Sequence, residues 1–312
     1  METKTVLVTG CSGYLGSVLS KKLKQNGFFV IGLDIKKPTH TYCDIFQQGD
    51  ICDMGVLNFV FSRGDIDTVF HLAGRIEVGE SMKHPTEFWR VNVNGLVNVL
   101  HQMKFHSVKN IIFSSSAGVY SPSELPISEK QSINNNSVYG QTKHVCEMAI
   151  EDSGLNYVIF RYFNLAGAEG ELGENHEPET HLIPNIFKNL NNFTINGDSY
   201  NTHDGTCIRD YVHVCDVADS HIQGANYLNS GKESIILNLG TGKGHSILDI
   251  ITIIENELGV KVNYHYGEKR LGDPNSLVAD TNLAKKVLNY RPKYDILSIL
   301  KSAYEWNKKD AP

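Results

Sequence analysis

The sequence lacks the features that mark secreted, membrane-bound and nucleic-acid-binding proteins. No apolar stretch approaches the length of a membrane span, and the N-terminal METKTVLVTG has no signal-peptide layout. The formal net charge is −6, which argues against a broad nucleic-acid footprint. We therefore expect a protein that binds neither membranes nor nucleic acid.

Cysteine and histidine patterns that would indicate disulfides or metal binding are also missing. The six cysteines lie far apart and form no C-x-x-C pair, so we interpret them as reduced thiols of a cytoplasmic protein. The histidines include no H-x-x-x-H helix pair with a nearby acid, and we interpret residues 176–181 as a solvated loop. The sequence thus predicts no metal site.

What the sequence does contain is an alternation of short apolar runs with longer amphipathic segments. This alternation predicts an α/β fold with a parallel, doubly wound sheet. The expected strands are 5–10, 28–34, 68–74, 110–116, 157–163 and 234–240, and the expected helices are 15–25, 87–105 and 138–152.

A change of texture after Asn164 indicates a second domain. Residues 165–208 are rich in Gly, Asn, Glu and His and show few regular periods. We therefore expect two domains, the larger formed by residues 1–164 plus about 209–243, and the smaller α/β domain by about 165–208 plus 244–312.

A glycine-rich loop follows the first expected strand. TGCSGYLG places Gly10, Gly13 and Gly16 between that strand and a helix, where backbone can approach a pyrophosphate and helix amides can bind it. Asp34 ends the second strand, 18 residues after Gly16. A carboxylate there can accept a ribose 2′-hydroxyl and repel a 2′-phosphate, which favours NAD over NADP. The alternatives are an ordinary glycine-rich turn and a solvated acid.

The segment SVYGQTKH (137–144) places Tyr139 four residues before Lys143. The polar residues around its start predict a helix N-terminus, because Asn and Ser side chains cap free amide groups. On a helix, residues four apart lie on one face, so the phenol and the ammonium would be neighbours. The pair is either an ordinary surface contact or a device for proton transfer.

Proton transfer by Tyr139 requires a large change in its pKa. A free tyrosine has a pKa of about 10, and lowering it to about 7 requires about 4 kcal/mol of preferential stabilisation of the phenolate. Lys143 and the positive ring of an oxidised nicotinamide are suitable sources. FSSSAGVY supplies Ser114, Ser115 and Ser116 at a strand end, where cofactors bind in open α/β sheets. Together with the glycine loop, these residues favour hydride-transfer chemistry.

An ordered series of motifs makes the sequence similar to a known family. The motifs are TGCSGYLG, HLAG, NVNG, FSSSAGVY, YGQTK, RYFN and IRDYVHV. The series resembles the extended short-chain dehydrogenase/reductases, and especially the NAD-dependent UDP-glucose 4-epimerases and their UDP-N-acetylglucosamine-using relatives. The resemblance implies a Rossmann domain that holds NAD tightly, a smaller domain that binds the UDP-sugar, and epimerisation at C4 through a 4-keto intermediate.

The resemblance also implies a role for each catalytic residue. Tyr139 would remove the proton of the sugar 4-hydroxyl as hydride leaves C4, and Lys143 would lower the tyrosine pKa and hold the nicotinamide ribose. Ser116 would hydrogen-bond the reacting oxygen. Residues 117–119 are Ala, Gly and Val, where dehydratases of the same superfamily carry an acid, so the reaction is expected to stop at epimerisation.

The binding residues that the resemblance implies form two sets. The cofactor set consists of Gly10, Gly13, Tyr14, Leu15, Gly16, Asp34, Asp50, Ile51, Leu72, Ala73, Gly74, Asn92, Ser114, Tyr139, Lys143 and Tyr162. The substrate set consists of Ser116, Tyr139, Asn164, His181, Leu182, Arg209, Arg270, Asp273 and Leu277. Arg209 and Arg270 match arginines that bind the UDP phosphates, where a planar guanidinium suits anionic groups.

Several positions depart from the family pattern, so the sequence does not decide which sugar the substrate carries. Asn196 replaces an aromatic residue near the uracil, and His181 replaces an asparagine of some members. Leu277 falls where side-chain size gates an N-acetyl group, and it is intermediate between the tyrosine of strict glucose users and the serine or cysteine of permissive members.

The leading interpretation is a UDP-glucose/UDP-galactose 4-epimerase. Its alternatives are a 4-epimerase for UDP-GlcNAc/UDP-GalNAc or another modified UDP-hexose, a nucleotide-sugar reductase, and a non-catalytic NAD-sensing regulator. The resemblance further suggests a homodimer formed through the expected helices 87–105 and 138–152.

Overall fold

The chain folds into two compact units, each with its own apolar core. The computed structural model describes residues 3–123, 126–134, 136–176, 179–270 and 273–310. Unit 1 comprises Met1–Tyr120, Ile133–Arg161 and Ala218–Leu237, and unit 2 comprises Ser121–Ser132, Tyr162–Val217 and Asn238–Pro312. Residues 121–132, 162–164, 209–217 and 238–243, which the sequence analysis assigned to the larger domain, fall in unit 2.

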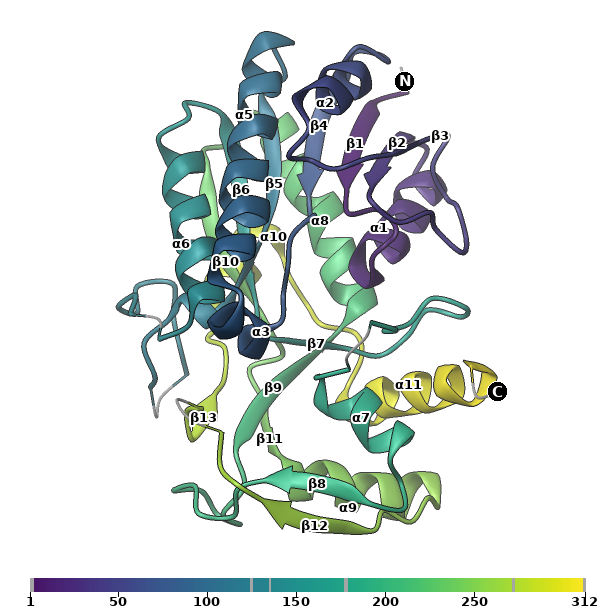
Figure 1. Cartoon of the computed structure of the whole chain (residues 1–312), viewed down its shortest axis with the longest axis vertical. Helices are drawn as coiled ribbons and strands as arrows, with labels where there is room; N and C mark the ends of the chain where they lie inside the picture. The colour runs from purple at the N-terminus through teal and green to yellow at the C-terminus, as the bar shows by residue number, and fades with distance from the viewer. Residues whose placement is uncertain (1–2, 124–125, 135, 177–178, 271–272, 311–312) are drawn as a thin grey trace. The chain divides into compact units, whose positions relative to one another are not determined.

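Unit 1 is built on a sheet whose strand order is β10-β6-β5-β4-β1-β2-β3 (Figure 1). The strands are β1 (Thr5–Thr9), β2 (Phe29–Asp34), β3 (Ile45–Gln48), β4 (Ile66–His71), β5 (Asn110–Ser116), β6 (Asn156–Tyr162) and β10 (Ile235–Leu239). β1 pairs in parallel with both β2 and β4, so the chain reverses its direction of winding between them. The expected doubly wound fold is confirmed, and such a reversal point is where open sheets bind ligands.

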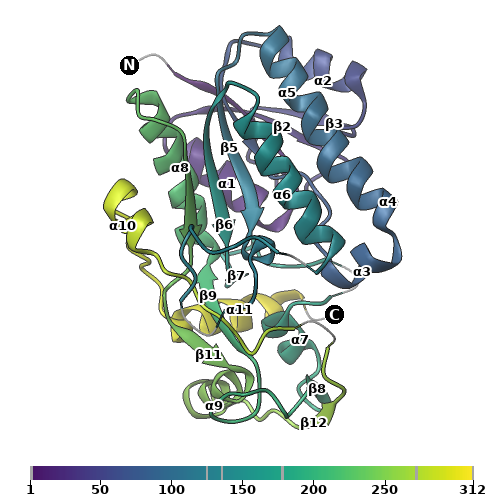
Figure 2. The same ribbon diagram turned by 90° about the vertical axis from the view of Figure 1, so that its left-hand side faces the viewer.

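Helices cover both faces of this sheet. They are α1 (Tyr14–Gln25), α2 (Met54–Phe61), α3 (Val78–Lys83), α4 (Pro85–Phe88), α5 (Gly95–Phe105), α6 (Val138–Glu151) and α8 (Val214–Asn229), with a π-helical segment at Trp89–Asn94 and a 3₁₀ turn at Ala117–Val119. α5 and α6 lie side by side on one face, and α1 and α8 on the other (Figure 2).

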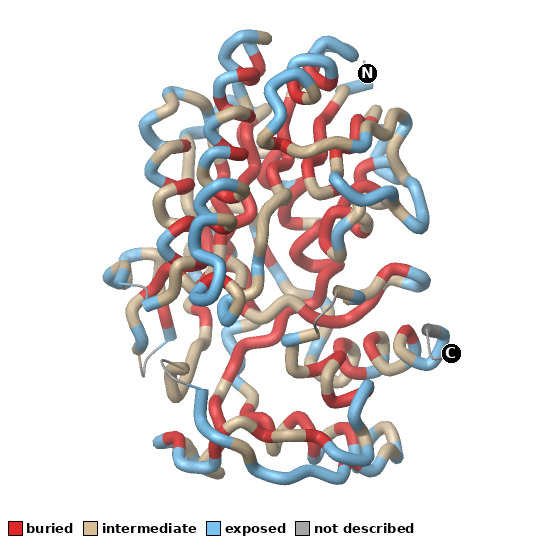
Figure 3. The backbone as a smooth tube through the Cα atoms, viewed as in Figure 1, coloured by how far each residue is buried: buried red, intermediate tan, exposed pale blue. Residues whose placement is uncertain are grey.

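The core of unit 1 follows the two-residue alternation of the strands. Leu7, Val69, Ile111 and Ile159 belong to the cluster that packs against α2, α5 and α6. Neighbouring strand residues point to the opposite face. Figure 3 shows that the strands form the buried centre of the unit.

Unit 2 is organised around β9 (Ile208–His213). β7 and β13 pair with β9 in parallel and β11 pairs antiparallel, while β8 and β12 form a separate parallel pair. Helices α7, α9 and α11 supply the apolar core. The bounds are β7 Asn164–Ala166, α7 Leu182–Lys188, β8 Phe193–Asn196, β11 Gly244–Ser246, α9 Ile247–Leu258, β12 Tyr264–Gly267, β13 Ser276–Leu277, α10 Asn282–Leu288 and α11 Ile296–Asp310.

Two further expectations concern membranes and thiols. In the described part of the chain, no helix combines the length and the apolarity that crossing a membrane needs. The six cysteines are free thiols, as the sequence analysis expected.

A buried ion pair attaches α6 to the sheet. Glu147 accepts hydrogen bonds from Arg161 Nε at 2.9 Å and from a terminal guanidinium nitrogen at 2.6 Å, and Ser115 makes a short contact with the same carboxylate. The Glu147 and Arg161 side chains are 1% and 4% exposed. The pair therefore joins α6 to β5 and β6 in the interior of unit 1.

Replacing Glu147 by alanine is expected to destabilise the protein strongly. The change leaves the Arg161 cation buried without its carboxylate, which costs about 3–5 kcal/mol. Denaturant unfolding followed by circular dichroism measures the loss. Glu151→Ala, an exposed position on the same helix, is the matched control and should change stability by no more than about 0.5 kcal/mol. Equal effects of the two substitutions would contradict the assigned role.

Candidate active site

The glycine loop joins β1 to α1 and leaves no room for side chains at two of its glycines. Gly10 has a φ of +75°, and an added Cβ would lie 2.8 Å from the Ala73 backbone nitrogen. A Cβ on Gly16 would lie 1.9 Å from the Gly10 carbonyl oxygen. No side chain in the described part of the chain caps α1 at Gly13. A close backbone turn at the N-terminus of a helix is suited to an anion such as a pyrophosphate.

Asp34 lies beside this loop, at the end of β2. Its carboxylate accepts the backbone N–H groups of Ser12 and Lys36, each at 2.9 Å. A carboxylate has about four acceptor positions, so two bonds leave capacity for ligand hydroxyls. Asp34 thus holds the loop in place and can still accept a hydrogen bond from a ribose hydroxyl, as the sequence analysis expected.

The segment after β4 runs along the same edge of the sheet. Leu72 N–H bonds the Thr9 carbonyl at 3.1 Å, and Ala73 N–H bonds the Thr9 hydroxyl at 3.3 Å. An added Cβ on Gly74 would lie 3.7 Å from Lys143 Nζ. Residues 72–74 therefore lie next to both the glycine loop and the lysine, as a cofactor-lining segment would.

Asn92 holds this segment in place. Its side-chain oxygen accepts Arg75 N–H at 2.8 Å, and its amide donates to the Arg75 carbonyl at 3.1 Å and the Thr142 hydroxyl at 3.0 Å. Asn92 is 3% exposed. These contacts join the end of β4 to α6, so Asn92 positions the two elements that carry Gly74 and the tyrosine.

Asp50 and Ile51 have different environments. Burial opposes ionisation of Asp50, but the Cys52 N–H and Arg90 outweigh it and lower its pKa, so the carboxylate is charged. Ile51 is 4% exposed and belongs to the core of unit 1. Any contact of Ile51 with a cofactor must therefore come mainly from its backbone.

Ser116 and Tyr139 meet at the end of β5. The Ser116 side chain lies close enough to the Tyr139 hydroxyl to lower its pKa, and the serine hydroxyl oxygen accepts Gly118 N–H at 3.0 Å. Ser137 caps α6 by accepting Gly140 N–H at 3.1 Å, which confirms the expected helix start. The structure thus brings together a serine and a tyrosine that lie 23 positions apart in the sequence.

Lys143 is buried on the same face of α6. Its ammonium donates to the Ser114 carbonyl at 2.7 Å and lies 6.0 Å from the centre of the Tyr139 ring. Burial lowers the pKa of Lys143. Burial, together with the charge of Lys143, also lowers the pKa of His71 to about 3, so this imidazole is neutral near pH 7. Lys143 is therefore the cation next to the tyrosine, and His71 adds no second charge.

The expected lowering of the Tyr139 pKa is not a property of the chain by itself. Burial raises the pKa of Tyr139 above its ordinary value, the hydrogen bond from Ser116 lowers it, and Glu77 raises it again. Lys143 is not among the groups that shift this pKa in the chain alone. The lowering expected from Lys143 together with an oxidised nicotinamide therefore stays a prediction for the chain with its cofactor bound.

In unit 2, the residues expected to bind the UDP phosphates lie close to one another. A terminal nitrogen of Arg209 donates to the carbonyls of Ile208 at 2.8 Å and Pro274 at 3.0 Å, and the other lies 3.5 Å from the Asp273 carboxylate. Arg209, Arg270 and Asp273 all act electrostatically on the hydroxyl of Tyr200. The three charged residues therefore share one neighbourhood.

Tyr200 is a candidate functional residue that the sequence analysis missed. It is 4% exposed, and its hydroxyl makes no hydrogen bond with any described residue. Lys269 Nζ lies 4.0 Å from the centre of its ring. A buried hydroxyl without a partner next to two arginines is suited to bind a ligand. Its only sequence signal was its position a few residues before the IRDYVHV motif.

The remaining unit-2 residues lie at element ends and on β13. Asn164 begins β7 and is paired with Tyr211 of β9, and Tyr162 is the last residue of β6. Leu277 pairs in register with Arg209, which brings the size-gating position next to a phosphate-binding candidate.

His181 and Leu182 lie at the start of α7, with His181 at the N-cap position. The solvated loop predicted around them is wrong in part. The His176 side chain is 17% exposed and that of Glu179 is 6% exposed, because they contact each other and their neighbours.

Comparison with known proteins gives a consistent assignment. Residues 6–240 match the model of the NAD dependent epimerase/dehydratase family. A UDP-glucose 4-epimerase from Lactobacillus helveticus is 40% identical over 319 residues, with 97% of each chain covered, and one from Rhizobium meliloti is 38% identical over 323 residues, with 99% of this chain and 98% of that protein covered.

A solved structure agrees with these relatives. The crystal structure of UDP-glucose 4-epimerase from Brucella ovis in complex with NAD superposes with a TM-score of 0.92 at 37% identity, covering 97% of this chain and 98% of that one. With the glycine loop, the serine, the tyrosine and the lysine arranged as described, the chain belongs to the NAD-dependent epimerase/dehydratase family.

Proposed function

We propose that this protein is an NAD-dependent 4-epimerase of UDP-hexoses. The observation that carries the proposal is the meeting of Ser116, Tyr139 and Lys143 at the end of β5, next to the glycine loop. Relatives of nearly the same length that are named UDP-glucose 4-epimerase support the same reaction.

The residues at the β1–β4 edge fit NAD. Gly10 and Gly16 allow close approach of the pyrophosphate, and Asp34 retains acceptor capacity for ribose hydroxyls. When bound, NAD supplies the acceptor and donor of the hydride that leaves and rejoins C4 of the sugar. Lys143 would hold the nicotinamide ribose.

Tyr139 carries the proton in this reaction. Its phenolate oxygen takes the proton of the sugar 4-hydroxyl during oxidation, and the resulting phenol returns it to the oxygen of the 4-keto sugar during reduction. Ser116 hydrogen-bonds the reacting oxygen and keeps it within reach of the tyrosine. A rotated keto sugar that is reduced on its other face has the opposite configuration at C4.

The burial of Tyr139 couples its ionisation to the charge around it. Its pKa is raised in the chain alone, so a neutral-pH phenolate requires more than about 4 kcal/mol of electrostatic stabilisation. Lys143 provides one positive charge, and the oxidised cofactor is the second source. Tyr139 therefore becomes a base chiefly when the oxidised cofactor is bound.

We propose that unit 2 binds the UDP moiety. Arg209 and Arg270 are suited to its phosphates, Asp273 to the uridine ribose, and the hydroxyl of Tyr200 to a phosphate or ribose oxygen. The residues after Ser116 are Ala117, Gly118 and Val119, so they offer no acid for the elimination of water. This absence favours epimerisation over dehydration.

The sugar is proposed to be glucose/galactose, with an N-acetylated pair or another modified hexose as the alternative. Leu277 is the residue proposed to discriminate between these sugars, because it pairs in register with Arg209, a candidate for binding the UDP phosphates. The reactive tyrosine and lysine argue against a regulator without turnover. Net consumption of added NADH with substrate would favour the reductase instead.

We also propose a cytoplasmic homodimer. The free cysteines fit a reducing compartment. Val97 and Phe105 on α5 and Met148 on α6 are 47%, 72% and 48% exposed. Adjacent helices that expose apolar side chains are suited to pack against a second copy of the same pair.

The first test of the function is Tyr139→Phe. The variant lacks the proton acceptor but keeps the ring. Its kcat for the interconversion of UDP-glucose and UDP-galactose should therefore be lower by about 10²–10⁴-fold. It should also retain the cofactor, which is measured by denaturing the purified protein and identifying the released nucleotide. Tyr227→Phe on α8 is the control and should behave as the unmodified protein. A fully active Tyr139→Phe enzyme would remove this tyrosine from the mechanism.

The second test is Leu277→Tyr. The larger side chain should reduce kcat/KM for UDP-GlcNAc by about 10-fold or more, since it occupies the space of the acetyl group, and should affect UDP-glucose much less. Kinetics with both sugars measure the ratio. An equal loss on the two sugars would show that this position does not gate the acetyl group.

The third test is Val97→Glu. A charge on the exposed face of α5 should convert the dimer to a monomer in sedimentation experiments, because it would have to be buried without a partner. Val78→Glu, at a 51% exposed valine of α3, is the control and should remain dimeric. A dimeric Val97→Glu protein would place the interface elsewhere.

A further inference from the structure

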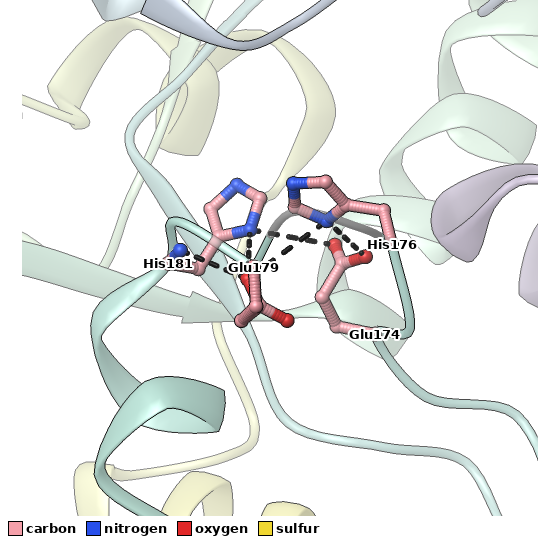
Figure 4. A group of neighbouring side chains, drawn as sticks. All are labelled: Glu174, His176, Glu179 and His181. Carbon is pink, nitrogen blue, oxygen red and sulfur yellow. Dashed lines mark hydrogen bonds and ion pairs between the residues drawn. The ribbon is translucent and has the colours of Figure 1, made fainter. Parts of the chain in front are cut away.

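Four side chains of unit 2 converge between β7 and α7 (Figure 4). Glu174, His176, Glu179 and His181 each offer one carboxylate oxygen or imidazole nitrogen, and these four atoms lie within 4.8 Å of one another. Two imidazoles and two carboxylates around one point are a combination that binds transition-metal ions.

Four of the separations between these atoms are within about 0.4 Å of the edges of a tetrahedron around a metal ion. His176 Nδ1 lies 3.0 Å from an oxygen of Glu174 and 3.8 Å from an oxygen of Glu179. His181 Nδ1 lies 3.9 Å and 3.1 Å from oxygens of the same two carboxylates. Ligands about 2.0–2.2 Å from a zinc ion are about 3.3–3.6 Å apart in a tetrahedral site. The observed distances lie on both sides of that value, so small shifts suffice to complete the site.

Each histidine forms one short hydrogen bond, His176 with Glu174 at 3.0 Å and His181 with Glu179 at 3.1 Å. The two pairs lie so close together that each imidazole nitrogen is also 3.8–3.9 Å from the carboxylate of the other pair. Glu179 is the most buried member; its Oε1 faces both imidazoles, and its Oε2 lies 3.8 Å from Lys188 Nζ. A buried carboxylate oxygen that faces two imidazoles is suited to share a cation with them.

We propose that Glu174, His176, Glu179 and His181 form a structural zinc site in unit 2. Zinc is favoured over magnesium and calcium, because those ions prefer all-oxygen sites with six or more ligands. Four protein ligands fill a tetrahedral zinc ion, so the site is closed to substrate and has no catalytic position.

A zinc ion at this position would fix the start of α7. His181 occupies the N-cap position of that helix, and the Asn185 side chain donates to the Glu179 carbonyl at 3.1 Å. The metal would therefore hold His181 and Leu182 in one conformation. A His181 imidazole bound to zinc would stabilise the segment rather than contact the substrate, so this proposal replaces the substrate role that the resemblance implied for that side chain; it does not depend on the proposed epimerase activity.

A second cluster in unit 2 provides a matched control. His203, Asp204 and Asp249 also lie within 4.8 Å of one another, but they include a single imidazole. The aspartates are engaged elsewhere, because Asp204 accepts the Thr206 N–H and Asp249 accepts the Ser246 N–H. His203 is 57% exposed. Removing this histidine should not affect zinc binding at the proposed site.

The test is zinc binding to the full-length protein. The protein is stripped with a chelator, reloaded with one equivalent of Zn²⁺, and titrated with a chromogenic zinc chelator, while elemental analysis gives the metal content. We expect one zinc ion for each chain. His176→Ala and the shape-conserving Glu174→Gln should each weaken binding by more than the roughly 10–100-fold that substitutions outside the ligand shell cause. His203→Ala should bind as the unmodified protein does.

Cobalt substitution reports the geometry independently. Co²⁺ bound to the unmodified protein should show the intense visible absorption of a tetrahedral ion, and Glu174→Gln should weaken or abolish it. The proposal is overturned if the chelator removes all zinc from the unmodified protein at once, if His176→Ala and Glu174→Gln bind zinc as tightly as it does, or if the cobalt spectrum is octahedral.

Discussion

The attachment of α6 to the sheet is the constraint on which the candidate active site depends. Tyr139, Lys143 and Glu147 are spaced by four residues, so they lie along one face of the helix. Glu147 fixes that face against the interior through its buried contacts with Arg161 and Ser115. With the rotation of the helix set in this way, the tyrosine reaches Ser116 and the lysine reaches the Ser114 carbonyl. A structural ion pair and the proposed catalytic pair thus share a single helix face.

Burial of that face has an electrostatic consequence. It raises the pKa of Tyr139, lowers that of Lys143, and keeps His71 neutral. Burying a charge costs free energy in such an environment, but a buried charge interacts strongly with the groups around it. The site is therefore arranged so that one added cation has a large effect on the tyrosine. In the proposed reaction, this property would make formation of the tyrosine base depend on the charge of the cofactor rather than on the chain alone.

Unit 2 depends on a different buried acid. Asp210 of β9 accepts backbone N–H groups of Thr241, Gly242 and Ala279 at 2.8, 2.9 and 3.2 Å. These bonds join β9 to the turn after β10 and to the segment after β13. Because Asp210 follows Arg209 directly, the same bonds stabilise the strand that presents the arginine and pairs with Leu277.

The sequence by itself determined the elements with strong local patterns. The apolar strands, the glycine loop before α1 and the Ser137 cap before α6 were all predicted, because burial and capping leave periodic or positional signals. β3 and α2 were missed, since IFQQ is short and partly exposed and MGVLNFVF is too uniformly apolar to show a helical period. Only the tertiary structure decided the pKa of Tyr139, the neighbours of Tyr200 and the meeting of Glu174, His176, Glu179 and His181. Those properties depend on desolvation and on contacts between segments that lie far apart in the sequence or are joined by an irregular loop. Desolvation and such contacts leave no periodic pattern in the sequence.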